Sequence, residues 1–256
     1  MSDIYSFSNG IHLRRSDLTA MQLARYSAPG NPNLHEPVEE EWVLRCFAQD
    51  VTAGAVFLDV GAGVGYYSLL VKKRWPEARV IAIEALPRHA DALEFNLALN
   101  GLMAGDIELI RAAVGPTRGE ASFVDLDYGS KLSAGEPGQT ILKVPVRTLG
   151  ELLATLPPVH LMKMDIQGTE LAVLKAARKL LARGQVRQVA IGTHGQRLHK
   201  EIGQLLARTD FTIMLDDPAP LMQPDGLLVA GHSADSAGIG RWMGTKIAAM
   251  IGKFFP

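Results

Sequence analysis

The chain contains a single cysteine, Cys46, among its 256 residues. It therefore cannot form an internal disulfide or a cysteine-ligated zinc site, which fits a reducing compartment. Charge of one sign is also lacking, because 26 Lys and Arg residues oppose 27 Asp and Glu residues, for a net charge of −1. Such a chain has no general attraction for phosphate backbones or anionic membranes, so we expect no nucleic-acid partner.

Long apolar runs are missing too. Residues 1–15 alternate polar and apolar side chains without the apolar core of a signal peptide. No stretch reaches the roughly 18 apolar residues of a membrane span. Apolar residues make up 47% and charged residues 21% of the chain, which is typical of a folded globular protein. We expect a cytoplasmic protein with one main domain.

Short β-branched runs alternate with segments of helical spacing from residue 55 to 189, which is typical of parallel βαβ units. The predicted strands are 55–60, 79–84, 107–111, 160–165 and 188–192, and the predicted helices are 66–74, 87–100 and 169–181. Two later strands, 211–216 and 226–230, lie too close together for a crossover helix and should pair antiparallel. The sequence thus predicts an α/β fold: a seven-stranded, Rossmann-like sheet of five parallel strands plus an antiparallel hairpin, as in the class I methyltransferases.

Three flanking regions complete this organisation. We interpret residues 1–54, with one helix at 38–47, as an N-terminal cap on a methyltransferase domain of residues 55–232. Two alternating runs, 121–126 and 142–149, predict an inserted hairpin or pair of edge strands that forms a wall of the substrate site. Residues 233–256 contain a basic amphipathic helix, 239–255, which we expect to dock on the protein body, on a second copy or on a membrane surface.

A glycine-rich turn, Asp59-Val-Gly61-Ala62-Gly63-Val-Gly65, follows the first predicted strand. Gly61 and Gly63 permit positive φ angles and let a ligand approach the turn and the next helix. Dinucleotide enzymes place G-x-G-x-x-G here, but Tyr66 occupies the last glycine position. Asp59 would repel a pyrophosphate and attract the ammonium and sulfonium of S-adenosylmethionine, although an ordinary turn carboxylate is the alternative.

Glu84 ends the second strand, 19 residues beyond Gly65. A carboxylate there can accept hydrogen bonds from both ribose hydroxyls, and a charge at a helix N-terminus is the alternative role. We also assign Ala85 and Ala112 to the cofactor site, with adenine recognised through backbone contacts around Ala112. An NAD-dependent oxidoreductase shares the turn and Glu84, so that class stays open.

Further motifs lie along the same part of the chain: DVGAGVGYYSLL (59–70), EALP (84–87), Asn96 and Asn100 on one helix, AAVG (112–115), VRTL (146–149) and KMDIQGTE (163–170). Together they resemble the FkbM-type S-adenosylmethionine-dependent methyltransferases over about residues 36–217. The resemblance implies S-adenosylmethionine as the donor and O-methylation of a hydroxyl on a small-molecule, secondary-metabolite or glycan acceptor. It also implies that Glu36, beside His35, closes over cofactor or substrate, with an exposed loop pair as the alternative.

Asp165 and His194 follow neighbouring strands, at the edge where open α/β sheets bind ligands. We expect His194 to take the acceptor proton, and Asp165 to orient His194 or take the proton itself, besides contacting the cofactor. A helix cap and an ordinary loop histidine are the alternatives.

Two acids of the family pattern are absent from this chain. Gln167 stands where the family's K-x-D-x-E-G-x-E segment has an acid, and Gly192 stands where E-x-H is frequent. Two ligands, Asp165 and His194, without a nearby acidic trio make a poor magnesium site, so we expect no metal. The missing charges also leave open a non-catalytic nucleoside-binding module.

Overall fold

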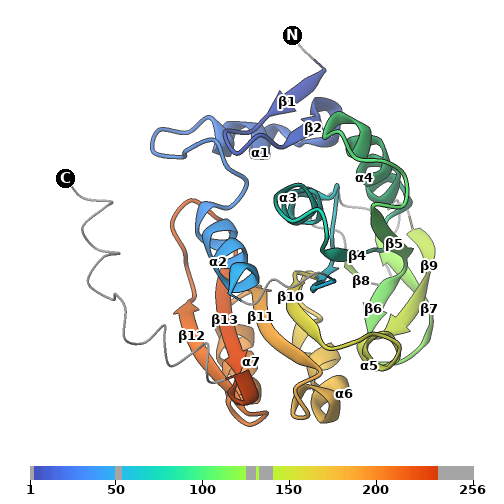
Figure 1. Cartoon of the computed structure of the whole chain (residues 1–256), viewed down its shortest axis with the longest axis vertical. Helices are drawn as coiled ribbons and strands as arrows, with labels where there is room; N and C mark the ends of the chain where they lie inside the picture. The colour runs from blue at the N-terminus through green and yellow to red at the C-terminus, as the bar shows by residue number, and fades with distance from the viewer. Residues whose placement is uncertain (1–2, 50–53, 125–130, 133–140, 236–256) are drawn as a thin grey trace.

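The computed structural model describes residues 3–49, 54–124, 131–132 and 141–235. At its centre lies a seven-stranded sheet (Figure 1). In spatial order its strands are β12 (Phe211–Asp217), β13 (Gly226–His232), β11 (Val186–Thr193), β10 (Val159–Met164), β3 (Val56–Val60), β4 (Arg79–Glu84) and β5 (Ile107–Arg111). The last five are parallel, and β13 is antiparallel to both β11 and β12. The predicted sheet, hairpin included, is confirmed.

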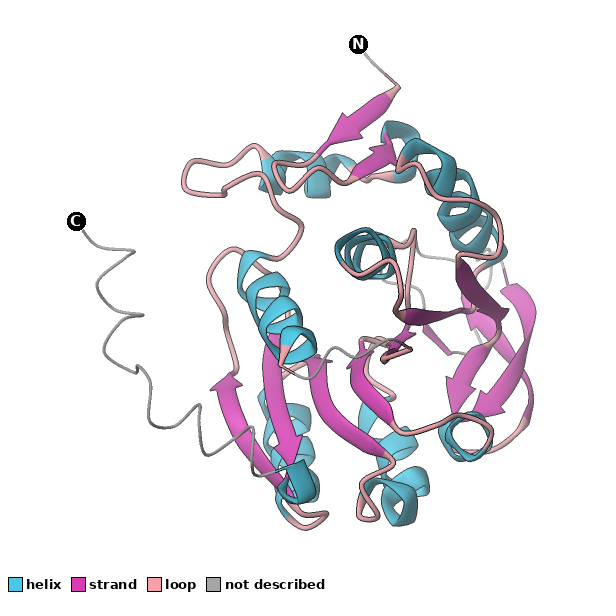
Figure 2. Cartoon of the chain, viewed as in Figure 1, coloured by secondary structure: helices cyan, strands magenta, loops and turns pink. Residues whose placement is uncertain are grey.

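Helices cover both faces of this sheet (Figure 2). One face packs against α2 (Pro37–Ala48), α3 (Tyr66–Arg74) and α4 (Pro87–Leu99), and the other against α5 (Leu149–Ala154), α6 (Glu170–Leu181) and α7 (Gln196–Ala207). Alternate residues of each strand face opposite ways, so Phe57 and Leu161 join the first core while Leu58 and Met162 join the second. Strands buried on both faces explain the nearly continuous apolar runs of the sequence.

The sequence predicted α3 residue for residue, and α4 and α6 to within one residue. It missed α7 and the short helix α5. The signal for α7 was present, because Leu198, Ile202 and Leu206 recur at helical spacing and pack into the core. The N-terminal residue Pro87 fixes the start of α4, since proline lacks the N–H that this position leaves unused.

The N-terminal region is more structured than predicted. It contains β1 (Ile4–Ser6), β2 (His12–Arg14) and α1 (Ala20–Tyr26) before the expected helix, α2. Two asparagines of α4 hold β2 in place. The amide of Arg14 donates to Asn96 Oδ1 (2.9 Å), the amide of His12 donates to Asn100 Oδ1 (3.0 Å), and Asn100 Nδ2 donates to the carbonyl of His12 (2.7 Å). These contacts attach the predicted cap to the sheet domain.

The insertion between β5 and β10 forms a sheet of its own rather than edge strands of the main sheet. Its strands are β6 (Ala113–Gly115), β9 (Ile141–Thr148), β7 (Gly119–Val124) and β8 (Lys131–Leu132), in that spatial order. Strands β7 and β9 pair antiparallel, so the hairpin part of the prediction is confirmed. Ala113, Val144 and Val146 pack against Ala85, the residue after Glu84. The substrate-wall role stays a prediction.

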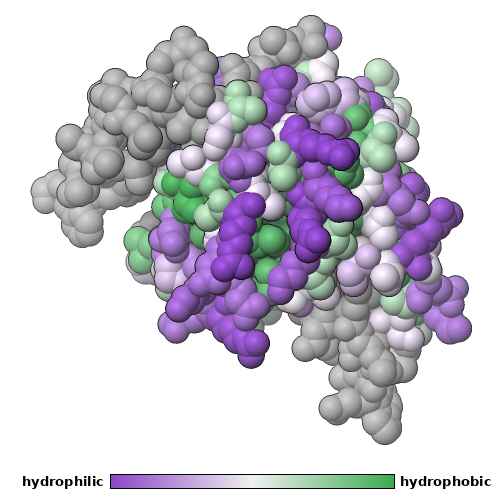
Figure 3. Space-filling view, turned by 90° about the horizontal axis from the view of Figure 1, so that it is seen from below, coloured by the Kyte–Doolittle hydropathy of each residue, from purple (hydrophilic) through white to green (hydrophobic). Residues whose placement is uncertain are grey.

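Seen from the end of the molecule that carries α6 and α7, hydrophilic side chains cover most of the surface, and hydrophobic areas between them are small (Figure 3). Within the described residues, no helix combines the length and apolar character that crossing a membrane requires. The predicted amphipathic helix 239–255 lies outside the described residues.

A close approach between the backbones of Gly61 and Asp165 leads to a first prediction. A Cβ added to Gly61, where φ is +82°, would lie 1.9 Å from the carbonyl oxygen of Asp165. Because neither backbone segment can withdraw without breaking the sheet, we expect Gly61→Ala to lower the free energy of unfolding by about 3 kcal/mol or more. Urea denaturation measures the change.

Gly101→Ala is the matched control for this prediction. Gly101 has a similar φ of +71° but open space around it, so its substitution isolates the backbone strain at about 1 kcal/mol. Equal losses for the two variants would contradict the close approach.

Candidate active site

The glycine turn lies at the carboxyl end of β3, directly before α3. Gly61, Gly63 and Gly65 all have positive φ angles, of 82°, 55° and 96°. The amides of Gly61 and Ala62 donate to the carbonyl of Ile83 at 2.9 and 3.0 Å, which ties the turn to β4. A side chain at Gly65 would meet Leu93 of α4. The predicted turn is therefore built from close contacts on two sides.

Glu84 ends β4 and is buried beside this turn. Its Oε2 accepts from the amide of Gly63 at 2.7 Å, and its Oε1 accepts from the amide of Leu86 at 2.8 Å. Each carboxylate oxygen has two acceptor sites, so each has one beyond the site that its backbone amide occupies, and His89 Nδ1 lies 3.7 Å from Oε1. Glu84 thus links the glycine turn to the start of α4.

The other predicted cofactor contacts lie near these groups. Ala62 is buried, and Ala85 is half-buried next to Glu84. Ala112 is buried, and its amide donates to the carbonyl of Glu84 at 3.0 Å. The neighbouring Arg111 points away, toward Asp91 (2.7 Å) and Glu94 (2.9 Å) on the surface of α4.

Asp59 lies beneath the turn, where only 1% of its surface is exposed. Ser68 Oγ donates to its Oδ2 at 2.7 Å, and its Oδ1 has no hydrogen-bond partner among the residues that the structure describes. Burial raises the pKa of Asp59, and the nearby ammonium of Lys163 opposes that rise.

Lys163 is the functional residue that the sequence analysis passed over, although it begins the KMDIQGTE segment. It stands beside Asp59 in the register of β3 and β10, its Nζ is 3.9 Å from Asp165 Oδ2, and it lies 5.0 Å from the centre of the Tyr67 ring. Burial lowers its pKa, but Glu39 and the carboxylates around it raise the pKa overall. The buried ammonium therefore stays charged.

Glu36 caps this region from the start of α2. It is buried, its Oε2 accepts from the Tyr67 hydroxyl at 3.3 Å, and it lies within ion-pair distance of Arg25 (3.9 Å) and His35 (3.8 Å). Burial opposes its ionisation, but His35 and a hydrogen bond with Glu39 lower its pKa, while burial and Glu36 raise the pKa of Glu39. Glu36 is thus part of the buried cap rather than an exposed loop residue.

The predicted pair Asp165 and His194 is brought together at the ends of β10 and β11. His194 Nε2 is 3.5 Å from Asp165 Oδ1, and Gln167 Nε2 donates to the same oxygen at 3.2 Å. Two acids that the sequence analysis did not assign join them. Glu170 Oε1 lies 3.2 Å from His194 Nδ1, and Asp225 Oδ1, from the β12–β13 loop, lies 3.4 Å from Nε2.

This arrangement controls the protonation of the group. Burial lowers the pKa of His194, but Glu170, Asp165 and Asp225 raise it overall to about 9. Burial also raises the pKa of Asp165, and it raises that of Asp225 to about 6. At neutral pH His194 is therefore an imidazolium among carboxylates, which opposes its predicted role as the base.

The premise for expecting no metal is wrong. It assumed that no acidic trio lies near Asp165 and His194, but Glu170 and Asp225 both approach the imidazole. Ligand-capable atoms of Asp165, Glu170 and His194 lie within 4.8 Å of one another.

A cavity of about 520 Å³ opens beside His194, between the starts of α6 and α7. Its lining includes Leu171, His194, Gln196, Arg197, Leu198 and Glu201. His194 thus forms part of the wall of this cavity.

The fold and the glycine turn define the Rossmann-like architecture of class I methyltransferases. The family model of the methyltransferase FkbM domain matches residues 59–213, more than half of the chain. The chain belongs to the FkbM methyltransferase family. The site residues named above lie within this match apart from Asp225 and the cap residues Arg25, His35, Glu36 and Glu39.

Similar proteins agree with this assignment. A Jannaschia sp. (strain CCS1) protein named as a methyltransferase is 25% identical over 80% of this chain and 81% of its own length. Methyltransferase sdnD of Sordaria araneosa is 26% identical to this chain. The aligned segment covers 46% of this chain and 58% of sdnD. The crystal structure of methyltransferase FkbM from Methylobacillus flagellatus KT shares the fold, with a TM-score of 0.53 at 20% identity over 71% of this chain and 44% of that one.

The buried cap generates a second prediction, on pH. Burial lowers the pKa of His35 to about 4, below the value of about 6.5 expected in the unfolded chain. Because the unfolded chain then binds more protons, the stability that neutral His35 provides above pH 6.5 is lost as the pH falls from 6.5 toward 4. We expect wild type to lose roughly 2 to 3 kcal/mol more than His35→Gln over this window in urea denaturation. Parallel curves for the two proteins would contradict it.

Proposed function

We propose that this chain transfers a methyl group from S-adenosylmethionine to a hydroxyl oxygen of a small molecule or glycan. One observation carries the proposal. The glycine turn with Glu84, and the pair Asp165 and His194, occupy the carboxyl ends of neighbouring parallel strands, and Asp225 reaches the same edge from the loop before β13. Open α/β sheets bind ligands at this edge, so a donor on one group and an acceptor on the other would meet there.

The residues on the donor side suit an S-adenosyl ligand. Glu84 keeps one acceptor site on each oxygen for the two ribose hydroxyls. The glycines leave the turn free of side chains, so that a ligand can lie against backbone amides at the start of α3. Asp59 and Glu36 add negative charge around the turn, which favours an ammonium and a sulfonium over a pyrophosphate.

S-adenosylmethionine supplies a methyl group on a sulfonium, and the C–S bond breaks as the new C–O bond forms. The hydroxyl proton must leave at the same centre. Asp165 and Asp225 are the carboxylates at this edge, whereas His194 already carries a proton. We therefore assign the proton to the Asp165 carboxylate and give His194 the role of orienting it, since the imidazole lies 3.5 Å from Oδ1.

The alternatives draw less support from the site. The family model and the relatives named above are methyltransferases rather than oxidoreductases, and Asp59 beneath the turn disfavours a dinucleotide. A non-catalytic module was suggested by the two missing acids at Gln167 and Gly192. Glu170 and Asp225 restore carboxylates to the group, so the groups needed for chemistry are in place.

A third prediction tests the donor. Calorimetric titration with S-adenosylhomocysteine is expected to show one site per chain, with NAD giving no heat. Glu84→Gln should weaken binding by about tenfold or more, because a neutral amide accepts hydrogen bonds on one side only. The control Glu94→Gln removes a surface carboxylate of α4 that pairs with Arg111 and should bind like wild type. Binding of NAD instead would refute the donor assignment.

A fourth prediction tests the proton acceptor. Radiolabelled methyl transfer to a panel of polyols, glycans and hydroxylated small molecules identifies an acceptor for the wild-type protein. With that acceptor, Asp165→Asn is expected to lower turnover by about 100-fold or more, the usual contribution of general base catalysis. Asp217→Asn, at the end of the edge strand β12, should keep wild-type turnover. Full activity in Asp165→Asn would overturn the assignment.

A further inference from the structure

Two carboxylates from different elements face the same ring nitrogen of His194. Asp165 Oδ1, at the end of β10, lies 3.5 Å from Nε2, and Asp225 Oδ1, in the loop before β13, lies 3.4 Å from it. A ring nitrogen offers a single proton or a single lone pair, so it cannot bond directly to both oxygens. Both separations are longer than an ordinary hydrogen bond, and each is compatible with two ligand atoms of a common metal ion.

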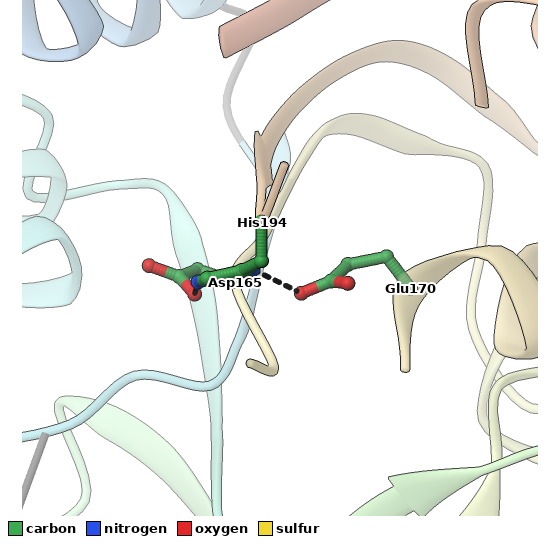
Figure 4. A group of neighbouring side chains, drawn as sticks. All are labelled: Asp165, Glu170 and His194. Atoms are coloured by element: carbon green, nitrogen blue, oxygen red, sulfur yellow. Dashed lines mark ion pairs between the residues drawn. The ribbon is translucent and has the colours of Figure 1, made fainter. Parts of the chain in front are cut away.

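The other ring nitrogen faces a fixed carboxylate. Glu170 Oε1 lies 3.2 Å from Nδ1, and the imidazole sits between the carboxylates of Asp165 and Glu170 (Figure 4). The amides of Ile166 and Gly168 donate to the same Oε1 at 3.0 and 3.1 Å, which holds it in place. A carboxylate on Nδ1 fixes the ring orientation and directs Nε2 toward Asp165 and Asp225. An ion bound to Nε2 takes the place of the proton that the ring carries in its absence.

The nitrogens of His194 are shielded from solvent and face carboxylates. Glu170 lies at ion-pair distance from Nδ1, and Asp165 and Asp225 lie at ion-pair distance from Nε2. Glu170 is fully buried, and its Oε1 is the oxygen that faces His194. Three carboxylates around one imidazole carry more negative charge than a single imidazolium balances, which favours a further cation here.

We propose that His194 Nε2, Asp165 and Asp225 bind a divalent transition-metal ion, with Glu170 as the outer carboxylate that orients the ring. Metal–ligand bonds of about 2.0 to 2.2 Å place neighbouring ligand atoms roughly 3.0 to 3.6 Å apart. The separations of 3.4 and 3.5 Å from Nε2 fall in this range. Lys163 faces Asp165 Oδ2, at 3.9 Å, which leaves Oδ1 for the ion.

The types of ligand atom indicate which class of metal ion fits the site. Imidazole is a good ligand for Mn²⁺, Fe²⁺ and Zn²⁺, whereas Mg²⁺ and Ca²⁺ prefer sites made of oxygen alone. One imidazole with two carboxylates therefore fits a transition metal that leaves coordination positions open. The site goes beyond the proposed function and does not depend on it, because metal binding can be measured without donor or acceptor.

The test is Mn²⁺ binding to the purified full chain after treatment with EDTA, followed by the loss of the free Mn²⁺ signal in electron paramagnetic resonance. We expect saturable binding of one ion per chain, competed by Zn²⁺ but not by a tenfold excess of Mg²⁺. Asp225→Asn should weaken binding by at least tenfold. Glu170→Gln should weaken it by about 10- to 100-fold, as expected for a carboxylate that orients a metal-bound histidine.

Two controls separate this site from adventitious binding and from misfolding. Asp217→Asn removes a carboxylate from the same hairpin whose Oδ1 accepts from the amide of Ala219 (3.1 Å), and it should bind Mn²⁺ like wild type. Asp225→Asn should retain the wild-type circular dichroism spectrum and affinity for S-adenosylhomocysteine. The proposal is wrong if neither Mn²⁺ nor Zn²⁺ binds stoichiometrically, or if Asp225→Asn binds them as wild type does. Failure to bind S-adenosylhomocysteine would instead refute the proposed function alone.

Discussion

The buried ammonium of Lys163 is the constraint on which the rest of the site depends. A buried charge without partners costs several kcal/mol, so a lysine in the middle strand of a sheet needs carboxylates around it. Four carboxyl groups lie around it: Asp59 from β3, Asp165 from the end of its own strand, and Glu36 and Glu39 from α2, where the pKa of Glu36 is lowered and that of Glu39 is raised by burial. The fold can bury this cation only if all these segments come together.

This requirement couples the cap to the sheet. Glu36 and Glu39 approach Lys163 only when α2 lies across β10 and β11, and the amide of Glu39 is in turn held by Gln223 Oε1 of the β12–β13 loop at 3.2 Å. The same loop carries Asp225 to His194. The cap, the hairpin and the strand ends therefore contribute charged groups to one connected cluster. A change in any of these three segments alters the charge around Lys163 and His194.

Local features of the sequence were enough to predict most of the fold. Strands β4 and β5 and helix α3 match the predictions residue for residue, because glycine turns and apolar runs fix their ends. The residues of the proposed S-adenosylmethionine site could be predicted equally well, because they belong to one strand–turn–helix unit and the next strand. Of the partners of His194, Asp165 was predicted from the sequence, whereas Glu170 and Asp225 were not. Asp225 reaches it through long-range pairing of β13 with β11, which no local pattern encodes.

The structure explains why this chain can lack the acids of the family pattern at Gln167 and Gly192. Gln167, where an acid was expected, donates its amide to Asp165 Oδ1. An acid there would repel that carboxylate, whereas the amide stabilises its charge. A side chain at Gly192 would begin 3.3 Å from the carboxyl carbon of Asp165, so an acid there would crowd it. The negative charge around His194 comes instead from Glu170 and Asp225. The charge around His194 thus depends on which elements of the fold meet there. The KMDIQGTE segment alone predicts fewer acidic residues at this site than the structure contains.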